Sequence, residues 1–527
     1  MSTGSGTRPF PRGDPSPEEP ALGRDSREEQ QRHIRGSALL VVGRVLSMLL
    51  SMATSVVLVR VLSKNEYGAF AYALALAAAA RVLLSLGQGR LLSRFMAKYQ
   101  EERDYPRMFG ALFLAIGTIF LTSVVCVTAV YLFPNALVGS ALHSETAVTL
   151  LLILVFLSPL QALDQVFVSL FAVFSKPSAI FFRKFLLAPG LQLVVVLLLA
   201  LTGASVTFLA VGYVIASLAG ILLYVVLFIA ALREQGLWKE LHPRRIVVPY
   251  KDVFEFSFPL ITGELALLSF TVGGVFVLGL SQPITEIANY RAVFNPARLN
   301  TAVMASFVTL FLPVVARFHT RGDPAGLRNS YWHTAAFVAV WTFPIFALTG
   351  PLAPATTVAL FGDRYAESAT VLAVLSVGYY INVALGFNAY TLQVCGRIRY
   401  LVGVNVVVAA LNIGLCLVLA PTDGAVGVAI ANCVALVTQN LLNQWALRGA
   451  IGSRFIDREA WLCYAIIAAG AGLLWGFQLF VSRGVVPDVA AAIVVSVAVL
   501  AGSRRALQLR ETFPELARIP VLGRFIS

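Results

Sequence analysis

Charged residues are scarce in this chain. Only 13% of its 527 residues are Asp, Glu, Lys or Arg, whereas 58% are hydrophobic and the mean hydropathy is +0.80. Soluble domains carry about 25% charged residues. A composition so poor in charge excludes a series of ordinary soluble domains and predicts a polytopic membrane protein.

Cysteine and histidine are also sparse, with five residues of each type. The cysteines lie in or beside apolar runs without the spacing of metal ligands, so we expect small helix-packing residues rather than disulfide partners. The histidines are scattered along the chain. We therefore expect no metal site and no cofactor.

The first 36 residues lack the run of about 7–15 apolar residues that follows the basic start of a signal peptide. They are rich in Pro, Gly, Ser, Arg and Glu, and we expect a disordered cytoplasmic tail. The net charge of +13 comes from basic residues spread in short clusters between apolar runs. That distribution is typical of membrane topology and argues against a nucleic-acid partner.

Long apolar runs make up most of the remaining sequence. A helix needs about 20 apolar residues to cross the bilayer core. Scanning for such runs predicts an all-α protein with about fourteen transmembrane helices, at 37–60, 68–90, 110–133, 147–173, 180–202, 205–232, 253–280, 286–314, 331–352, 367–394, 399–420, 424–447, 459–482 and 485–502.

Lysine and arginine alternate between the connections. Six alternate connections carry 21 basic residues, among them Arg183 and Lys184, whereas the intervening ones carry only Lys64, Arg364 and Arg483. Cytoplasmic loops hold an excess of Lys and Arg. Both termini, including the basic tail 503–527, are therefore predicted to be cytoplasmic.

Three sequence segments recur in the second half of the chain. "VLSKNEYGAFAY" (61–72) is similar to "GLSQPITEIANY" (279–290), and "MAKYQEERD" (96–104) to "VARFHTRGD" (315–323), with Asp104 and Asp323 at an offset of 219. "LALTGASVTFLAVGYVIA" (199–216) is similar to "VLAPTDGAVGVAIANCVA" (418–435). Matches in one order at a nearly constant offset indicate an internal repeat.

Each repeat contains six spans, so both copies enter the membrane in the same sense. This predicts two six-helix bundles related by a pseudo-two-fold axis near the membrane normal, with a cavity between them. The bundles are expected at 37–232 and 253–448, joined by a cytoplasmic linker at 233–252, and two extra C-terminal helices at 459–502 lie outside the repeat.

The segment "RVLSKNEYGAFAYALALAAAARVLLSLGQGRLLSRFMAKY" (60–99) carries a family resemblance, through Arg60, Leu62, Glu66, Tyr67, Gly68, Leu86, Gly87 and Arg94. With the six-plus-six repeat, it resembles the polysaccharide transport branch, the Wzx-type flippases, of the multidrug/oligosaccharidyl-lipid/polysaccharide exporter superfamily. The likeness spans roughly residues 37–450.

The resemblance implies a flippase of the bacterial inner membrane that is not an enzyme. Such a protein moves undecaprenyl-diphosphate-linked oligosaccharide from the cytoplasmic to the outer leaflet by alternating access, for O-antigen, capsule or exopolysaccharide biosynthesis. Some members couple transport to an ion gradient. The implied partners are the lipid-linked oligosaccharide, membrane lipids, and the polysaccharide polymerase and glycosyltransferases of the pathway.

Two arginines lie near the middle of predicted spans, where a charge is costly and usually faces a wet cavity or a partner. Arg81 is in the second span, and Arg298 is at nearly the same depth in the eighth, the second span of the other repeat. A guanidinium matches phosphate oxygens bidentately. We expect Arg81 and Arg298 to bind the diphosphate group; the alternative is that their side chains snorkel to an interface.

Other polar residues within the spans are secondary candidates. Arg44 and Arg291 are further substrate-binding candidates, for which snorkelling is at least as good an explanation, and Asn295 lies one helical turn from Arg298. Asp164 and Glu264 are candidates for ion coupling, or they pair with one of the arginines.

Three alternative functions remain open. A multidrug/cation antiporter of the same superfamily would favour an acidic cavity, whereas this sequence places arginines at mid-span. A peptidoglycan-precursor (lipid II) flippase would also use arginines in its cavity. A membrane-embedded glycosyltransferase or polymerase is disfavoured, because no cluster of Asp, Glu and His has catalytic spacing.

Overall fold

The computed structural model describes residues 42–85, 88–134, 144–174, 177–240, 246–249, 264–265, 267–452, 456–481, 484–504 and 506–507. The regular elements in these segments are all helices. Helices suit a membrane because each satisfies its own backbone hydrogen bonds without water. The predicted tail 1–36, the start of the predicted seventh span (253–263) and most of the C-terminal tail (508–527) lie outside the described residues.

The first half of the described chain begins with a span at Val42–Val61. It continues with α2 (Lys64–Ser85), α3 (Gln88–Glu101), α4 (Tyr105–Leu132), α6 (Glu145–Leu154), α7 (Leu157–Val173), α8 (Pro177–Ile180), the π-helix η1 (Phe181–Leu187), α9 (Ala188–Thr202), α10 (Val206–Glu234) and the 3-10 helix η2 (Leu237–Glu240).

The second half contains the π-helix η4 (Ser269–Gly273), α12 (Gly274–Ser281), α13 (Ile284–Ala297), α14 (Leu299–Thr320), α15 (Pro324–Thr349), α16 (Ala353–Phe361), the 3-10 helix η5 (Asp363–Tyr365), α17 (Ser368–Leu385), α18 (Phe387–Val394) and α19 (Ile398–Ile451). Two further helices follow, α20 (Arg458–Phe480) and α21 (Val485–Ser503).

Twelve helices of the described residues are long and apolar enough to cross a membrane. One of them, α19, contains both predicted spans 399–420 and 424–447, which meet at Gly424, where φ is 54° and ψ is −132°. The predicted seventh span is represented by the shorter apolar helix Ser269–Ser281. The structure thus agrees with about fourteen spans, and the chain is a multi-pass membrane protein.

The predicted second span, 68–90, begins earlier in the structure than expected, at Lys64. Ser63 and Glu66 explain the difference because they form a capping box. The Glu66 N–H donates to the Ser63 hydroxyl (3.2 Å), and the Ser63 N–H donates to the Glu66 carboxylate (3.0 Å). The reciprocal bonds satisfy backbone donors that a helix start leaves open.

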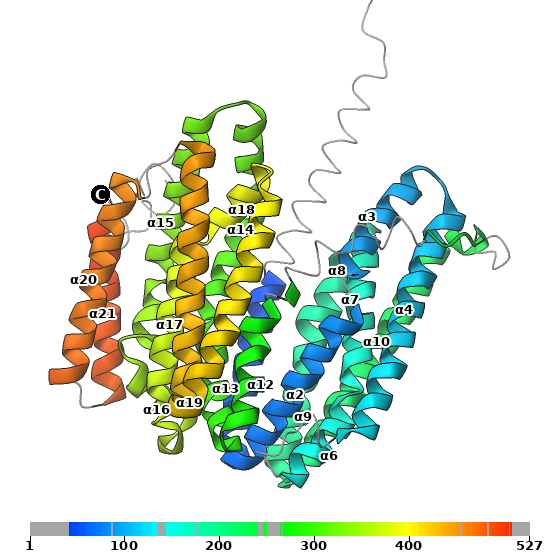
Figure 1. Cartoon of the computed structure of the whole chain (residues 1–527), viewed down its shortest axis with the longest axis horizontal. Coiled ribbons are helices and arrows are strands. Elements are labelled where there is room, and N and C mark those ends of the chain that lie inside the picture. Colours follow the sequence, from blue (N-terminus) through cyan, green and yellow to red (C-terminus); the bar gives the residue numbers. More distant parts are fainter. Residues whose placement is uncertain are drawn as a thin grey trace, which may run out of the picture.

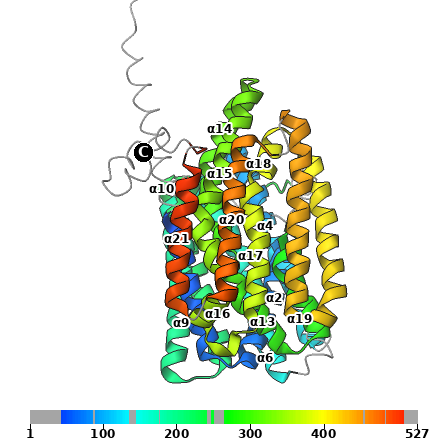
Figure 2. The same ribbon diagram turned by 90° about the vertical axis from the view of Figure 1, so that its left-hand side faces the viewer.

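The helices form two lobes that meet at one end and diverge toward the other (Figure 1). One lobe contains α2 to α10, and the other contains α12 to α19. The helices α20 and α21 pack on each other and on α15, and the turned view shows them on the outer face of the second lobe (Figure 2). The fold is the two-lobed bundle with two appended helices that the sequence predicted.

The segments that matched in sequence occupy equivalent positions in the structure. Asp104 caps the start of α4 by accepting from the Arg107 N–H (3.2 Å), and Asp323 caps the start of α15 by accepting from the Gly326 N–H (2.8 Å). Gly203, with φ of 62°, ends α9, and its counterpart Gly424 breaks α19. The repeat therefore reproduces the capping aspartate and a glycine of positive φ at matched positions.

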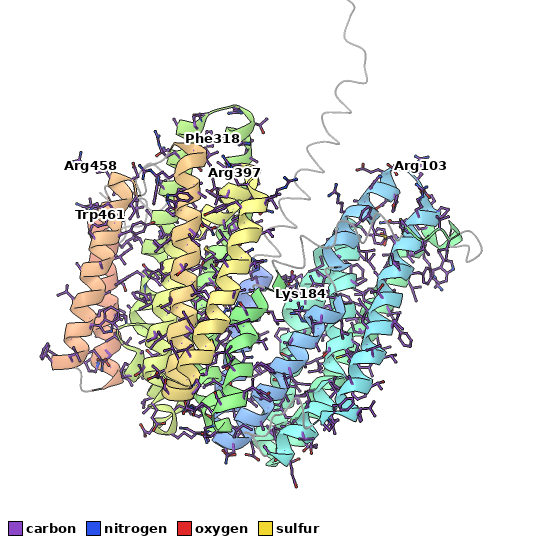
Figure 3. The ribbon with its side chains drawn as sticks, in the orientation of Figure 1. Arg103, Lys184, Phe318, Arg397, Arg458 and Trp461 are labelled. Atoms are coloured by element: carbon purple, nitrogen blue, oxygen red, sulfur yellow. The ribbon has the colours of Figure 1, made fainter. Side chains whose placement is uncertain are left out.

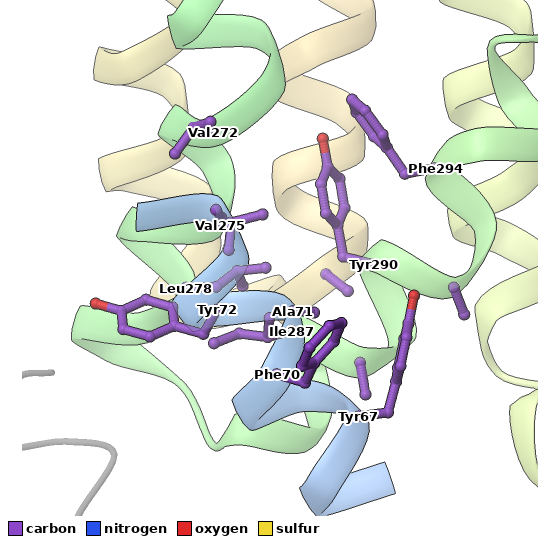
Figure 4. Packing of buried hydrophobic residues seen from close by; sticks show 14 of the residues in the cluster. Tyr67, Phe70, Ala71, Tyr72, Val272, Val275, Leu278, Ile287, Tyr290 and Phe294 are labelled. Carbon is purple, nitrogen blue, oxygen red and sulfur yellow. The ribbon is translucent and has the colours of Figure 1, made fainter. Parts of the chain in front are cut away.

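The lobes meet through α2 and α13, which are also repeat equivalents. Gly68 lies so close to the Ile284 carbonyl that a Cβ would overlap with it, and Gly279 lies equally close to the Tyr72 ring. Tyr72, Ile287 and Tyr290 are buried around this crossing (Figure 4). Small residues let two membrane helices approach closely where no water drives them together.

A set of contacts at the meeting end joins the two halves of the chain. The Arg60 guanidinium donates to the carbonyls of Ala359 (2.5 Å) and Leu360 (2.8 Å), near the end of α16. The Arg364 guanidinium in turn donates to the Val59 carbonyl, near the end of the first span. Each arginine thus satisfies carbonyls that a helix C-terminus leaves without partners.

Lys64 and Glu367 add an ion pair to these contacts, with Nζ and Oε2 3.7 Å apart. The Lys64 ammonium also lies 5.3 Å from the Tyr365 ring centroid. Burial raises the pKa of the Tyr365 hydroxyl, so the ring stays neutral. We call Arg60, Lys64, Arg364 and Glu367 the cross-lobe latch.

Basic residues of three separate connections gather at the diverging end. Arg103, Arg397 and Arg458 all lie there (Figure 3), whereas α6 and α16 lie at the opposite end (Figure 1). This arrangement agrees with the predicted alternation of basic and neutral connections. Within the predicted linker, Val247 donates its N–H to the Pro106 carbonyl (3.3 Å) at the start of α4.

Candidate functional site

The fifth span carries two adjacent cations within the π-helix η1, Arg183 and Lys184. The sequence analysis counted both among the basic residues of a connection, and in the structure they lie near the start of the apolar helix Ser178–Thr202. The helix starts early because Pro177 is tolerated in a first turn, where its missing N–H costs nothing. π-Helical turns occur often at functional sites.

Arg183 is buried in the first lobe with its charge neutralised. Its Nη2 lies 2.8 Å from Oδ1 of Asp164, and the two side chains are 5% and 22% exposed. The guanidinium lies 5.4 Å from the Tyr224 ring centroid and rests against Gly220, where a Cβ would overlap with it. Asp164, predicted to couple an ion or to pair with an arginine, therefore has an arginine partner.

Lys184 lies at the border between the lobes (Figure 3) and is half-buried. It interacts electrostatically with Asp164, Arg44 and Arg81. Arg81 is half-buried and interacts in the same way with Glu264. The predicted residues Arg44, Arg81, Asp164 and Glu264 are thus linked by electrostatics, and Lys184 is a member that the sequence analysis missed.

The start of the first span lies between the two lobes. A Cβ on Gly43 would lie 2.7 Å from the Phe181 ring and 2.8 Å from the Phe185 ring, both on η1. The neighbouring Arg44 donates to the Ala305 carbonyl on α14 of the other lobe (3.1 Å). Arg44 therefore lies where the lobes face each other.

A second group of cations lies in the other lobe. Arg291 donates weakly to the Thr271 carbonyl on η4 (3.4 Å), and its guanidinium is 5.1 Å from the Phe294 ring centroid. Arg298 lies 5.1 Å from the same ring and 5.7 Å from the Tyr379 ring. No described residue forms a salt bridge with either arginine, so cation–π contacts are their main stabilisation.

Arg298 stands at a bend in the eighth span. Pro296 ends α13 because its ring excludes the normal helical hydrogen bond, and α14 begins at Leu299. The bend opens a cavity of about 180 Å³. The cavity lies between the first span and α14, and its lining is Met48, Ser51, Met52, Asn295, Arg298, Leu299, Thr301 and Ala302.

The predicted neighbours Asn295 and Arg298 share this cavity, and the Arg298 Nε has no hydrogen-bond partner among the described residues. No hydrogen bond, ion pair or ring contact of the described residues joins Arg298 to Arg81. The predicted site residues therefore form two groups, one in each lobe, with Arg44 between them. Their roles in binding and coupling remain predictions.

Sequence reasoning missed Arg183, Lys184 and Tyr379. The signal for the first two was present, because "FFRKF" (181–185) opens an otherwise apolar run. Because they lie close to the preceding connection, we counted them among the basic residues that set the membrane topology. Tyr379 carried no signal, since an aromatic residue inside a membrane helix is ordinary.

The family model of polysaccharide biosynthesis proteins matches residues 33–319, more than half of the chain. The chain belongs to the polysaccharide biosynthesis protein family. No curated protein is similar enough in sequence to count as a match. The family and the fold point to a transporter rather than an enzyme.

Solved structures show which fold this family member shares. The structure titled lipid II flippase MurJ in an inward closed conformation superposes with a TM-score of 0.68, at 15% identity over 92% of this chain and 100% of that one. An inward-facing multidrug resistance MATE transporter of the MOP superfamily gives 0.62, at 13% identity over 78% and 99%. An outward-facing MATE structure gives 0.51, at 14% identity over 80% and 97%.

Proposed function

We propose that this family member is a flippase that moves undecaprenyl-diphosphate-linked oligosaccharide from the cytoplasmic to the outer leaflet. One observation carries the proposal: Arg298, which no described carboxylate neutralises, lines a cavity between the first span and α14. A guanidinium in hydrocarbon is costly without a partner. An anionic group crossing between the lobes supplies that partner, and a diphosphate fits guanidinium geometry.

The arrangement of the lobes supports loading from the cytoplasm. The lobes diverge at the end that carries the basic connections, and Lys and Arg mark cytoplasmic loops. The better fit to the inward-facing than to the outward-facing MATE structure supports the same orientation. Alternating access then requires the opposite end to open. Both termini lie in the cytoplasm, and the membrane is the bacterial inner membrane.

The exported glycan serves O-antigen, capsule or exopolysaccharide synthesis. The glycosyltransferases that build the lipid-linked unit and the polymerase that joins units are the partners of such a flippase. Asp164 and Glu264 are the candidates for coupling to an ion gradient. Asp164 is paired with Arg183, and Glu264 interacts electrostatically with Arg81.

Transport of a labelled undecaprenyl-diphosphate oligosaccharide in proteoliposomes tests the function. Wild-type protein is expected to make the labelled lipid accessible in the opposite leaflet. Arg81→Ala and Arg298→Ala are each expected to lower the rate at least about tenfold, because each removes charge-assisted hydrogen bonds to phosphate. Arg317→Ala is the matched control, since Arg317 is exposed and donates only to Pro313 of its own helix. Wild-type rates in both site variants would contradict the proposal.

The rival functions are separated in the same vesicles. Lipid II is the first competitor, because the MurJ fold covers most of this chain. Faster transport of lipid II than of the undecaprenyl-diphosphate oligosaccharide would reassign the substrate. Efflux of a cationic dye without glycan transport would indicate a drug/cation antiporter. Unneutralised arginines are unsuited to that function because they repel a cationic substrate.

A further inference from the structure

The first turn of α13 is fastened to the break in α19. The half-buried Glu286 carboxylate, in that turn, accepts from the Ala425 N–H through its Oε2 (2.8 Å). Ala425 directly follows Gly424, the residue with non-helical φ and ψ inside α19. The second half of α19 therefore begins at this contact, and Glu286 satisfies a backbone donor that a helix start leaves open.

The contact depends on a glycine at position 424. A Cβ on Gly424 would lie 2.6 Å from the Glu286 Oε2. The other carboxylate oxygen, Oε1, accepts from the Asn289 side chain (3.0 Å), which in turn accepts from the Ser368 hydroxyl on α17 (3.4 Å). No described residue forms a salt bridge with Glu286, so the positive end of the helix that starts at Ala425 stabilises its charge.

The internal repeat shows that the turn itself does not need this glutamate. Gly68 occupies the position of Glu286 in the matched segments 61–72 and 279–290. The first lobe still turns between its fifth and sixth spans at Gly203, the counterpart of Gly424, and α10 then begins without a side-chain cap. Glu286 is therefore an addition of the second lobe, and we expect it to do more than form the turn.

The helix that carries Glu286 is short and ends at a bend. Its repeat equivalent α2 has 22 residues, whereas α13 has 14 and is followed by the bend before α14. Because the next helix does not continue its line, the direction of α13 depends on its own contacts. Arg298 lies at the far end of α13, about 18 Å beyond Glu286 at the rise of an α-helix, so a tilt of α13 moves Arg298 more than any residue before it.

Two hydrogen bonds of the described residues tie α13 to the second half of α19. One is the Glu286 contact with Ala425, and in the other the Tyr290 hydroxyl accepts from the Asn432 side chain (3.0 Å). The two bonded residues of α13 are one helical turn apart. A pair of contacts along a helix fixes its direction, whereas a single contact leaves it free to pivot.

We propose that Glu286 is a positioning residue for substrate binding. It fixes the direction of α13 and thereby keeps Arg298 at the cavity between the first span and α14. Without Glu286, α13 tilts and the Arg298 guanidinium leaves its place 5.7 Å from the Tyr379 ring of α17. This assignment rests on the proposed function, in which Arg298 binds the diphosphate, and it makes that function more specific.

Lipid binding to purified full-length protein in nanodiscs tests the role of Glu286. The probes are undecaprenyl diphosphate and undecaprenol, which has no phosphate. Glu286→Ala is expected to weaken undecaprenyl diphosphate binding by about tenfold, the usual loss for one hydrogen bond to a charged group, and to leave undecaprenol binding unchanged. Glu286→Gln is expected to restore most of the affinity, because an amide oxygen still accepts from the Ala425 N–H.

Asp323→Ala is the matched control. Asp323 also accepts from the N–H of a helix start, that of Gly326, at 2.8 Å, so its loss costs a similar amount of stability. It caps α15, which contributes no residue to the cavity. This variant should therefore have a lower melting temperature and an unchanged affinity for undecaprenyl diphosphate. An equal loss of affinity in Asp323→Ala and Glu286→Ala would overturn the assignment, since both effects would then be structural.

The Arg298→Ala background shows whether Glu286 acts through Arg298. Two residues that act on one contact have non-additive effects. In that background Glu286→Ala should leave the remaining affinity nearly unchanged, and a further tenfold loss would overturn the assignment. Wild-type protein that binds no undecaprenyl diphosphate would contradict the proposed function itself. Binding that Arg298→Ala weakens and Glu286→Ala does not would contradict only the role of Glu286.

Tyr290→Phe tests the same idea with a variant that keeps its ring in the core. It removes the other hydrogen bond between α13 and α19, because the Asn432 side chain loses the hydroxyl and keeps its bond to the Phe270 carbonyl (3.0 Å). The affinity for undecaprenyl diphosphate should fall severalfold and that for undecaprenol should not change. An unchanged affinity for undecaprenyl diphosphate would show that these two bonds do not set the direction of α13.

Discussion

Arginines inside the spans are stabilised in two different ways. Arg183 is paired with Asp164 and covered by protein, and its charge is neutralised even though its Nε has no hydrogen-bond partner among the described residues. Arg298 lies over Phe294 and keeps a buried Nε without a partner among the described residues. A ring face offsets part of the cost of a buried charge but accepts no strong hydrogen bonds. The two arginines therefore differ in charge balance, because a carboxylate neutralises Arg183 and no described carboxylate neutralises Arg298.

Removal of one member of the buried pair is expected to destabilise the first lobe. Asp164→Ala leaves the Arg183 charge buried and uncompensated, which costs about 3–5 kcal/mol of unfolding free energy. Asp164→Ala combined with Arg183→Met is expected to regain most of that loss, because no unpaired charge remains. Denaturant unfolding in detergent measures the unfolding free energy of both variants. An Asp164→Ala variant as stable as the wild type would contradict the pairing.

At the scale of helices, proline and glycine place the functional side chains. Pro296 bends the eighth span, so that Arg298 and Asn295 line a cavity instead of following a straight helix. Gly68 lets α2 approach the start of α13 closely, and Gly279 lets α12 approach Tyr72 of α2. Gly68 and Pro296 thus act on α2 and α13, which the repeat relates to each other.

Gly68→Ala is expected to disturb this crossing. The new Cβ would overlap with the Ile284 carbonyl, a backbone atom that cannot move aside like a side chain. Overpacking of this kind costs about 1–3 kcal/mol, and the melting temperature in detergent should fall. Gly117→Ala on α4 is the matched control, because a Cβ there meets nothing within 4 Å. Equal melting temperatures for the two variants would show that the crossing tolerates a side chain.

At the scale of the whole molecule, the two lobes are held together at one end and separate at the other. The cross-lobe latch lies at the meeting end, where Arg60 and Arg364 each donate to a helix end in the other half of the chain. The alternating access that we propose requires these bonds to break when that end opens. On that proposal, we expect the latch to favour the conformation in which this end is closed.

Loss of the latch is expected to shift the balance between the closed and open conformations of this end. Arg60→Ala together with Arg364→Ala removes the bonds to α16 and to the first span, and the population with separated ends should rise severalfold. Spin labels at Val61→Cys and Ala366→Cys, with the five native cysteines replaced by alanine, report the distance across this end. Arg399→Ala, an exposed residue at the start of α19, is the control. An unchanged distance distribution in the double variant would show that the latch does not hold the lobes.

Much of the fold could be predicted because a membrane acts on composition over short stretches. The apolar run at 110–133 contains most of the helix Tyr105–Leu132, and the five cysteines are free, as expected. The ends of the helices were less predictable, because capping residues decide where a helix begins, as Ser63 and Glu66 do for α2. The proposed domain limits, including the linker 233–252, remain predictions.

The sequence alone determined the number of spans, their alternation and the internal repeat, since each depends on local hydropathy, charge or similarity. Only the tertiary structure decided which charges are neutralised and which stay open to a ligand. Arg44 and Ala305 are 261 residues apart in the chain, yet they are hydrogen-bonded. Arg183 and Lys184 are neighbours in sequence, yet one is closed into a pair and the other faces the border between the lobes. A charge in hydrocarbon takes its role from what surrounds it in space, and packing alone sets those surroundings.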